Sequence, residues 1–170
     1  MKIDLRNLEE GINALTWDET PGDLSLADVS QDFIPPIRTK MNVVKFGESL
    51  TASGSSSFRL RQQCARCLES FEQSFSVDFQ FIFHKGDSET PDESGDEAIV
   101  LIREEAGHLD LANEVRGCIL VEIPMNPACD EDCKGLCSSC GVNLNTETCG
   151  CTHETTDSRW DALREMKNTQ

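Results

Sequence analysis

The sequence predicts an α+β fold, with a mostly antiparallel β-sheet or partial barrel, one main helix and a C-terminal cysteine-rich zinc module. Three observations support this prediction. Apolar side chains alternate with polar ones through residues 71–83, an amphipathic helical pattern covers residues 110–123, and six of the nine cysteines lie within residues 129–151. Such alternation is typical of a strand with one buried face, and clustered cysteines are typical of a metal site.

The length of 170 residues suits one domain with a small appendage. We expect a β-rich domain over residues 1–126, a metal-binding module over residues 127–152 and a tail over residues 153–170. In the tail, Trp160 and Leu163 have the spacing of one face of a short helix. We therefore expect a hydrophobic core to stabilise the first segment, a metal to stabilise the second and a docked helix to attach the third.

Charge limits the possible partners. Fifteen basic residues stand against thirty-one acidic ones, which gives a formal net charge of −16. An acidic surface repels nucleic-acid phosphates and attracts basic proteins, so the overall charge favours a protein partner. Residues 35–83 are the exception, because they hold six basic and four acidic side chains.

The N-terminal segment bears on the state of the cysteines. Residues 1–10 are charged throughout and lack the apolar run of a signal peptide, and no later segment approaches the roughly 18 apolar residues of a membrane span. We therefore expect a cytoplasmic protein with reduced thiols and no membrane association. A secreted disulfide framework is the alternative, but an odd number of cysteines fits it poorly.

The first part of the chain predicts short strands and turns. Ile3 and Leu5 alternate as in an edge strand, and residues 19–23 have the composition of a turn. The Pro35–Pro36 pair can enter no helix and donates no ladder hydrogen bond. Residues 41–46 are apolar enough for a strand.

Residues 51–57 are rich in serine and glycine, and we expect a loop there. Beyond it, Phe58 and Leu60 should point inward while Arg59 and Arg61 point outward. The Cys64–Cys67 pair would then lie in the turn before the next strand.

The phenylalanine stripe over residues 71–83 predicts a long strand with one buried face. A base-stacking platform is the alternative, although an aromatic stripe at strand spacing is usually core. Residues 84–97 are acidic and suit a solvated loop, or a surface that attracts a basic partner. Residues 98–102 return as a short apolar strand.

The main helix is predicted over residues 110–123. Asp110 can cap its first turn, Leu111, Val115 and Ile119 share its apolar side, and Pro124 ends it. Cys118 lies on the same side, where a buried small hydrophobe is the simplest interpretation.

The remaining eight cysteines form four pairs of close neighbours. These are Cys64 and Cys67, Cys129 and Cys133, Cys137 and Cys140, and Cys149 and Cys151. Gly141 can supply the positive-φ turn that follows Cys140. Asn143 and Asn145 tolerate the left-handed conformation that a tight loop between Cys140 and Cys149 would require.

Four pairs are enough for two tetrahedral sites. The favoured arrangement joins the last two pairs locally and joins the first two across the fold, although a single local zinc with spare cysteines is also open. His153 is an alternative ligand beside Cys151. Zinc is preferred over an iron–sulfur cluster because neither ferredoxin spacing occurs. A site made only of sulfur is structural by default.

Catalytic alternatives have little support. Cys64 and Cys67 could form a thiol oxidoreductase motif in which Arg66 lowers a thiolate pKa, but no thioredoxin-like pattern surrounds them. His84 and His108 have no nearby partner for a nucleophile–base pair, and no phosphate loop or dinucleotide fingerprint occurs. We therefore expect no enzymatic activity and no small-molecule substrate.

Several of these motifs together resemble the YceD family of bacterial and plastid proteins. They are the Cys-Ala-Arg-Cys-Leu-Glu run at 64–69, Val-Glu-Ile-Pro-Met at 121–125, and Cys133-Lys-Gly-Leu-Cys137-x-x-Cys140-Gly-x-Asn-Leu-Asn145 followed by Cys149-x-Cys151. The start, Ile-Asp-Leu-Arg-Asn-Leu at 3–8, is similar too. The resemblance implies a role in accumulation of large-subunit ribosomal RNA.

Two modes of binding are compatible with that role. In the first, Arg59, Arg61 and Arg66 touch the large-subunit rRNA, neutralising about three phosphates. In the second, the protein is an acidic adaptor or chaperone that holds a basic large-subunit ribosomal protein. The net charge of −16 favours the second for direct binding.

Overall fold

The computed structural model describes residues 1–29, 31–47, 49–85, 99–102 and 107–152. The acidic loop predicted at 84–97 falls almost wholly outside these residues, as do His153 and the terminal helix predicted in the tail. Among the described residues, no helix is long and apolar enough to cross a membrane.

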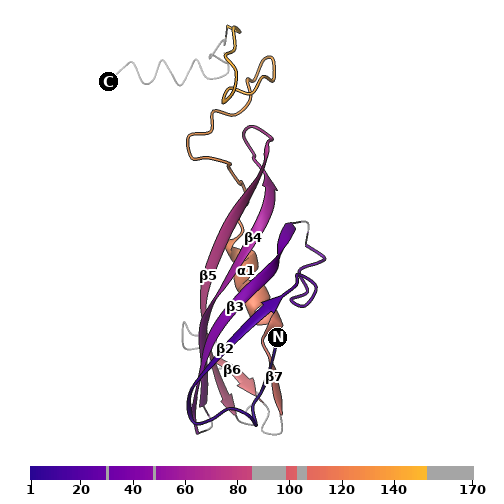
Figure 1. Cartoon of the computed structure of the whole chain (residues 1–170). Helices are drawn as coiled ribbons and strands as arrows, with labels where there is room; N and C mark the ends of the chain where they lie inside the picture. The colour runs from indigo at the N-terminus through magenta and orange to yellow at the C-terminus, as the bar shows by residue number, and fades with distance from the viewer. Residues whose placement is uncertain (30, 48, 86–98, 103–106, 153–170) are drawn as a thin grey trace, which may run out of the picture.

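The fold is a long, mostly antiparallel sheet with one helix, as the sequence predicts (Figure 1). The elements are β1 (Lys2–Asp4), β2 (Gly11–Glu19), β3 (Asp32–Phe46), β4 (Ser49–Gln63), β5 (Ser70–Lys85), β6 (Ile99–Ile102), β7 (His108–Asp110) and α1 (Ala112–Glu122). The five-stranded sheet has the order β2-β3-β4-β5-β6, and β1 pairs with β7 in a separate two-stranded sheet.

Strands β2 to β5 pair antiparallel, whereas β6 runs parallel to β5. Figure 1 shows α1 lying along the sheet, and the chain beyond it continuing past the tip of the β4–β5 hairpin. The hairpin tip and the cysteine-rich segment are therefore neighbours, although far apart in sequence.

The core lies between one face of the sheet, α1 and the N-terminal segment. Alternate residues of β3 to β5 face it, which confirms the predicted inward direction of Phe58 and Leu60 and the buried face of the phenylalanine stripe. Its fully buried side chains include Leu24, Leu26, Ile37, Val43, Leu60, Phe83, Leu111, Val115 and Ile119. Burying each such side chain contributes about 1.5–3 kcal/mol relative to leaving it exposed.

The serine-rich run at 51–57 is not a loop, so that prediction was wrong. It forms the middle of β4, where residues Thr51 to Ser57 pair with both β3 and β5. Glycine is required at position 54, because a Cβ there would overlap the carbonyl oxygen of Lys40. The buried hydroxyls of Ser56 and Thr39 bond each other at 2.7 Å, so their polarity is satisfied inside the core.

The double proline interrupts pairing without ending the strand. Ile34 pairs with Arg59 and Arg38 pairs with Ser57, so the register shifts across Pro35–Pro36. β2 pairs with β3 only from Ile37 onward, which leaves the prolines beside an open edge where a missing donor costs little.

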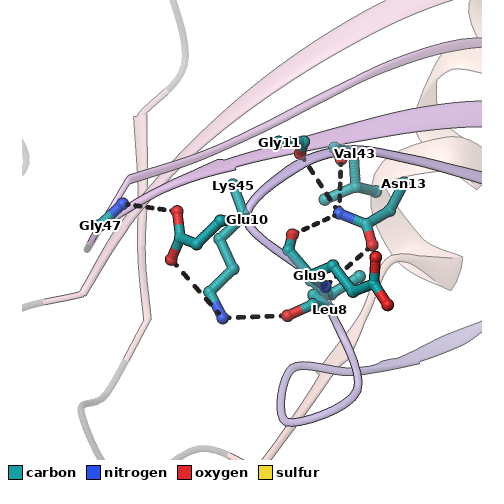
Figure 2. Close-up of polar contacts among 8 residues, drawn as sticks. All are labelled: Leu8, Glu9, Glu10, Gly11, Asn13, Val43, Lys45 and Gly47. Carbon is teal, nitrogen blue, oxygen red and sulfur yellow. Dashed lines mark hydrogen bonds and ion pairs between the residues drawn. The ribbon is translucent and has the colours of Figure 1, made fainter.

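Polar contacts tie the segment between β1 and β2 to the end of β3 (Figure 2). The Asn13 amide donates to the Glu9 carbonyl oxygen at 2.8 Å and to the Val43 carbonyl oxygen at 3.3 Å, and accepts from the Glu9 N–H. The Lys45 ammonium donates to the carbonyl oxygen of Leu8 at 3.1 Å. These bonds hold the N-terminal segment on the sheet.

Helix α1 is close to its predicted extent. Asp110 accepts a hydrogen bond from the N–H of Ala112, although the N-cap position itself is Leu111, which offers no side-chain bond. Cys118 packs against the core as predicted, and burial raises the pKa of its thiol. That cysteine therefore behaves as a hydrophobe.

Candidate metal centres

Four sulfurs meet where the β4–β5 hairpin contacts the chain beyond α1. Cys64 and Cys67 come from the hairpin turn, and Cys129 and Cys133 from the segment after the helix. All four sulfurs lie within 4.8 Å of one another. The Cys64 and Cys133 sulfurs are 3.8 Å apart and those of Cys67 and Cys129 are 3.6 Å apart. We call this group the first tetrad.

A second tetrad forms locally, from Cys137, Cys140, Cys149 and Cys151. Its sulfurs also lie within 4.8 Å of one another. The Cys149 sulfur is 3.5 Å from that of Cys140 and 3.3 Å from that of Cys137. The structure thus gathers the eight cysteines in the arrangement that the sequence favours, and their role as ligands remains a prediction.

The two tetrads fit zinc. Four sulfurs at about 2.3 Å from a tetrahedral zinc would be about 3.8 Å from one another, close to the sulfur separations in both groups. A disulfide needs a separation of about 2.05 Å, and all nine cysteines are free. Four sulfur donors also leave no open position for substrate, which suits a structural ion rather than a catalytic one.

Backbone turns aim N–H groups at sulfurs of both tetrads. Cys137 Sγ accepts from the N–H groups of Ser139 and Cys140, each at 3.4 Å, and Cys64 Sγ accepts from Arg66 N–H at 3.4 Å. Gly141 follows with φ +75°, as predicted. Hydrogen bonds of this kind stabilise thiolates, the form that binds metal.

The thiol pKa values within each tetrad diverge for that reason. The Cys67 N–H lowers the pKa of Cys64 to about 6, and the Cys140 N–H does the same for Cys137. The hydrogen bond with the Cys67 sulfur raises the pKa of Cys129 to about 12, and the Cys149 sulfur raises that of Cys151 to about 12. The side-chain hydrogen bond from Asn145 also lowers the pKa of Cys133, so without metal the first tetrad favours thiolate at Cys64 and Cys133, and the second favours it at Cys137.

The first tetrad spans the predicted boundary near residue 126. The N–H of Ala65 donates to the carbonyl oxygen of Pro127 at 2.8 Å, and that of Leu136 donates to the carbonyl oxygen of Arg66 at 3.0 Å. Gly135 has φ +73°, and a Cβ there would lie 3.0 Å from the same Arg66 oxygen. The cysteine-rich segment is thus joined to the hairpin tip by backbone contacts as well as by sulfurs.

The three arginines that the sequence proposes for RNA binding have different surroundings. Arg61 pairs with Asp32 at 3.2 Å and with Glu72 at 3.0 Å, and Arg59 lies 4.0 Å from Glu72. These two share the outward face of β4. Arg66 instead donates to the carbonyl oxygens of Glu131 at 2.8 Å and Cys133 at 3.2 Å.

Sequence analysis missed how the two asparagines act. Neither Asn143 nor Asn145 has a positive φ, so the expectation of a left-handed excursion there was wrong. Their side chains shape the turn instead: Asn143 Oδ1 accepts from the Asn145 N–H at 3.0 Å, and Asn145 Oδ1 accepts from the Lys134 N–H at 2.8 Å. The Asn-x-Asn spacing was the available signal.

The fold and the two sulfur groups define a class of protein: a mostly antiparallel sheet with two all-cysteine groups that could hold metal, one shared between a hairpin tip and the C-terminal segment and one within that segment. The chain belongs to the YceD family, because the family model described as large ribosomal RNA subunit accumulation protein YceD matches residues 52–167. That range contains both tetrads.

Similarity to individual proteins is spread across bacteria and plants. An uncharacterized protein of Mycobacterium tuberculosis is 29% identical over 147 residues, covering 86% of this chain and 70% of its own. The Arabidopsis thaliana large ribosomal RNA subunit accumulation protein YCED homolog 1, chloroplastic, is 24% identical over 78% of this chain and 49% of its own. A maize protein of the same name is 46% identical over 44 residues, covering 26% of this chain and 15% of its own. No solved structure matches the chain significantly.

Proposed function

We propose that this protein is a non-enzymatic ribosome-biogenesis factor that supports accumulation and processing of large-subunit (23S) rRNA and carries structural zinc in its tetrads. The observation that carries the proposal is the family match over residues 52–167, which includes all eight tetrad cysteines. The relatives named for this function in Arabidopsis and maize support it.

Zinc would act on the fold rather than on a substrate. Structural zinc contributes on the order of 10 kcal/mol in small domains, because the free energy of binding becomes free energy of folding. In the first tetrad that energy would fasten residues 129–133 to the β4–β5 hairpin tip. A loaded first tetrad would thereby hold the cysteine-rich segment in one position relative to the sheet.

The adaptor hypothesis has more support than direct RNA contact. The guanidinium of Arg61 is already paired with two carboxylates, and Arg66 is bonded to backbone oxygens. Each of these contacts would have to be lost or shared before a phosphate could be bound. With a net charge of −16, a basic large-subunit ribosomal protein is the favoured direct partner.

Cells depleted of the protein provide the test of the general function. We expect a lower ratio of large-subunit to small-subunit rRNA, restored by the wild-type chain and not by a Cys64→Ser/Cys67→Ser variant that accumulates to the same level. An unchanged rRNA ratio after complete depletion would contradict the proposal.

Neutral substitution of two arginines separates the two binding modes. The variant Arg59→Gln/Arg61→Gln removes positive charge without placing new carboxylates beside Glu72, and Arg66 is left intact because it holds the cysteine-rich segment. Arg38→Gln is the matched control, since Arg38 lies on the same face and pairs with Asp18 at 2.7 Å. The adaptor hypothesis predicts unchanged rRNA association after crosslinking in cells. A loss confined to the double variant would favour direct RNA contact.

A further inference from the structure

One side chain connects the two tetrads. The Asn145 amide nitrogen donates to the sulfur of Cys133, a first-tetrad member, at 3.3 Å, and to Asn143 Oδ1 at 2.9 Å. Its amide oxygen accepts from the N–H of Lys134 at 2.8 Å. Both the nitrogen and the oxygen of the amide are therefore hydrogen-bonded to residues within or between the two tetrads.

The backbone of Asn145 belongs to the second tetrad, because it lies in the loop between Cys140 and Cys149. That loop is held against the preceding chain: Leu144 N–H donates to the Gly135 carbonyl oxygen at 2.9 Å, and Cys137 N–H donates to the Val142 carbonyl oxygen at 2.8 Å. A metal in the second tetrad would fix both ends of the loop. A metal in the second tetrad would therefore also steady the Asn145 amide, whose hydrogen bond reaches the first tetrad.

We propose that Asn145 couples the two metal centres, so that zinc in the second tetrad strengthens zinc binding in the first. The inference rests on the zinc centres of the proposed function and adds that occupancy of the second centre affects zinc binding at the first. An N–H donated to a ligating sulfur stabilises its thiolate and fixes its orientation, and losing such a partner typically weakens metal affinity 10- to 100-fold.

The variant Asn145→Asp removes the donor with little change in shape. An aspartate oxygen can still accept from Lys134 N–H, so that loop contact is kept, but the hydrogen bonds to the Cys133 sulfur and to Asn143 Oδ1 are both lost. Thr146→Ala is the matched control, because the Thr146 hydroxyl donates to the Asn143 carbonyl oxygen in the same loop and bonds neither tetrad. Circular dichroism of the β-sheet would confirm that each variant is folded.

The experiment is a cycle of four proteins: wild type, Cys140→Ser/Cys149→Ser, Asn145→Asp, and the combination. Each is loaded with zinc and treated with increasing chelator. Alkylation of the four first-tetrad thiols, of which Cys64 has the lowered pKa and Cys129 is exposed, is followed by peptide mass to report zinc loss from the first tetrad. In the wild type, disabling the second tetrad should weaken first-tetrad affinity 10- to 100-fold. In the Asn145→Asp background, the same change should add less than about threefold.

The outcomes distinguish failure of this inference from failure of the proposed function on which it rests. The protein could bind two zinc ions and yet show the same first-tetrad zinc affinity with and without an intact second tetrad. That result would overturn the coupling and leave the zinc centres in place. Full dependence on the second tetrad in Asn145→Asp would overturn the role of Asn145. If wild-type protein bound no zinc, the metal centres would fail together with the coupling.

Discussion

The guanidinium of Arg66 donates a 2.8 Å hydrogen bond to the carbonyl oxygen of Glu131, across 65 residues of sequence. The same nitrogen reaches the carbonyl oxygen of Cys133. These bonds run from the hairpin tip to the backbone between two first-tetrad sulfurs. The arginine between Cys64 and Cys67 thus positions the opposite half of the site.

Replacing Arg66 by alanine should loosen the cysteine-rich segment without unfolding the sheet. Its bonds to backbone oxygens are charge-assisted but partly solvent-exposed, so we expect a loss of about 1 kcal/mol in docking. Limited trypsin digestion should show faster cleavage after the exposed Lys134. Arg59→Ala should leave the cleavage rate unchanged, and equal rates in both variants and the wild type would contradict the role of Arg66.

Metal content should follow the two tetrads. Protein purified without a metal-binding tag should contain two zinc ions, falling to one in Cys137→Ser/Cys140→Ser and to one in Cys64→Ser/Cys67→Ser. Cys118→Ser should retain both ions, since that cysteine packs against the core. Elemental analysis of each protein against its concentration gives the ratio. If the wild type contains one zinc and Cys64→Ser/Cys67→Ser retains it, metal binding is restricted to the second tetrad.

The metal-free, reduced protein should gain thiolate at unusually low pH. Because the pKa values of Cys64 and Cys137 are lowered from 9.0 to about 6, absorbance at 240 nm should rise as the pH is raised through 6. The folded pKa lies below the unfolded one, so this contribution to stability is complete above about pH 9 and is lost as the pH falls through 6.

A Cys64→Ala/Cys137→Ala variant is the control for that titration. Its absorbance should lack the step near pH 6, because the two thiols whose pKa values are lowered to about 6 are gone. A single rise near pH 9 in the wild type would contradict the expected divergence of the thiol pKa values.

Gly54→Ala should destabilise the sheet. The new methyl group would meet the backbone of Lys40, and the two strands cannot separate without losing hydrogen bonds, so we expect at least about 2 kcal/mol of lost stability. Ser53→Ala, one position away, should change stability by less than about 0.5 kcal/mol. Urea denaturation would measure both, and similar midpoints would show that the sheet adjusts to the methyl group.

Sequence patterning predicted the parts of the fold in which burial alternates with exposure. The strand through Phe79 and Phe83 and the helix through Val115 and Ile119 were predictable because their apolar side chains match the period of the element. The grouping of cysteines was also accessible, since pairs of thiols with short spacing must meet other pairs to complete a tetrahedron.

Elsewhere local composition was misleading. β2 was missed because Ile12 is 76% exposed while Asn13 faces inward, the reverse of the usual pattern; backbone oxygens satisfy the Asn13 amide there. The serine run of β4 has low strand propensity, and strands on both sides impose its conformation. Neither the bonds of Arg66 nor the bond from Asn145 to the Cys133 sulfur follows from composition, because they depend on which atoms the tertiary fold brings together.

The two tetrads also differ in the length of chain that each must close. Cys140 and Cys149 are 9 residues apart, whereas Cys67 and Cys129 are 62 apart. Loop-closure entropy makes the longer closure about 1.7 kcal/mol more costly in an unfolded chain. Assembly should therefore be ordered in time, with the local sulfur cluster closing early and the distant one closing only after the hairpin and helix have formed.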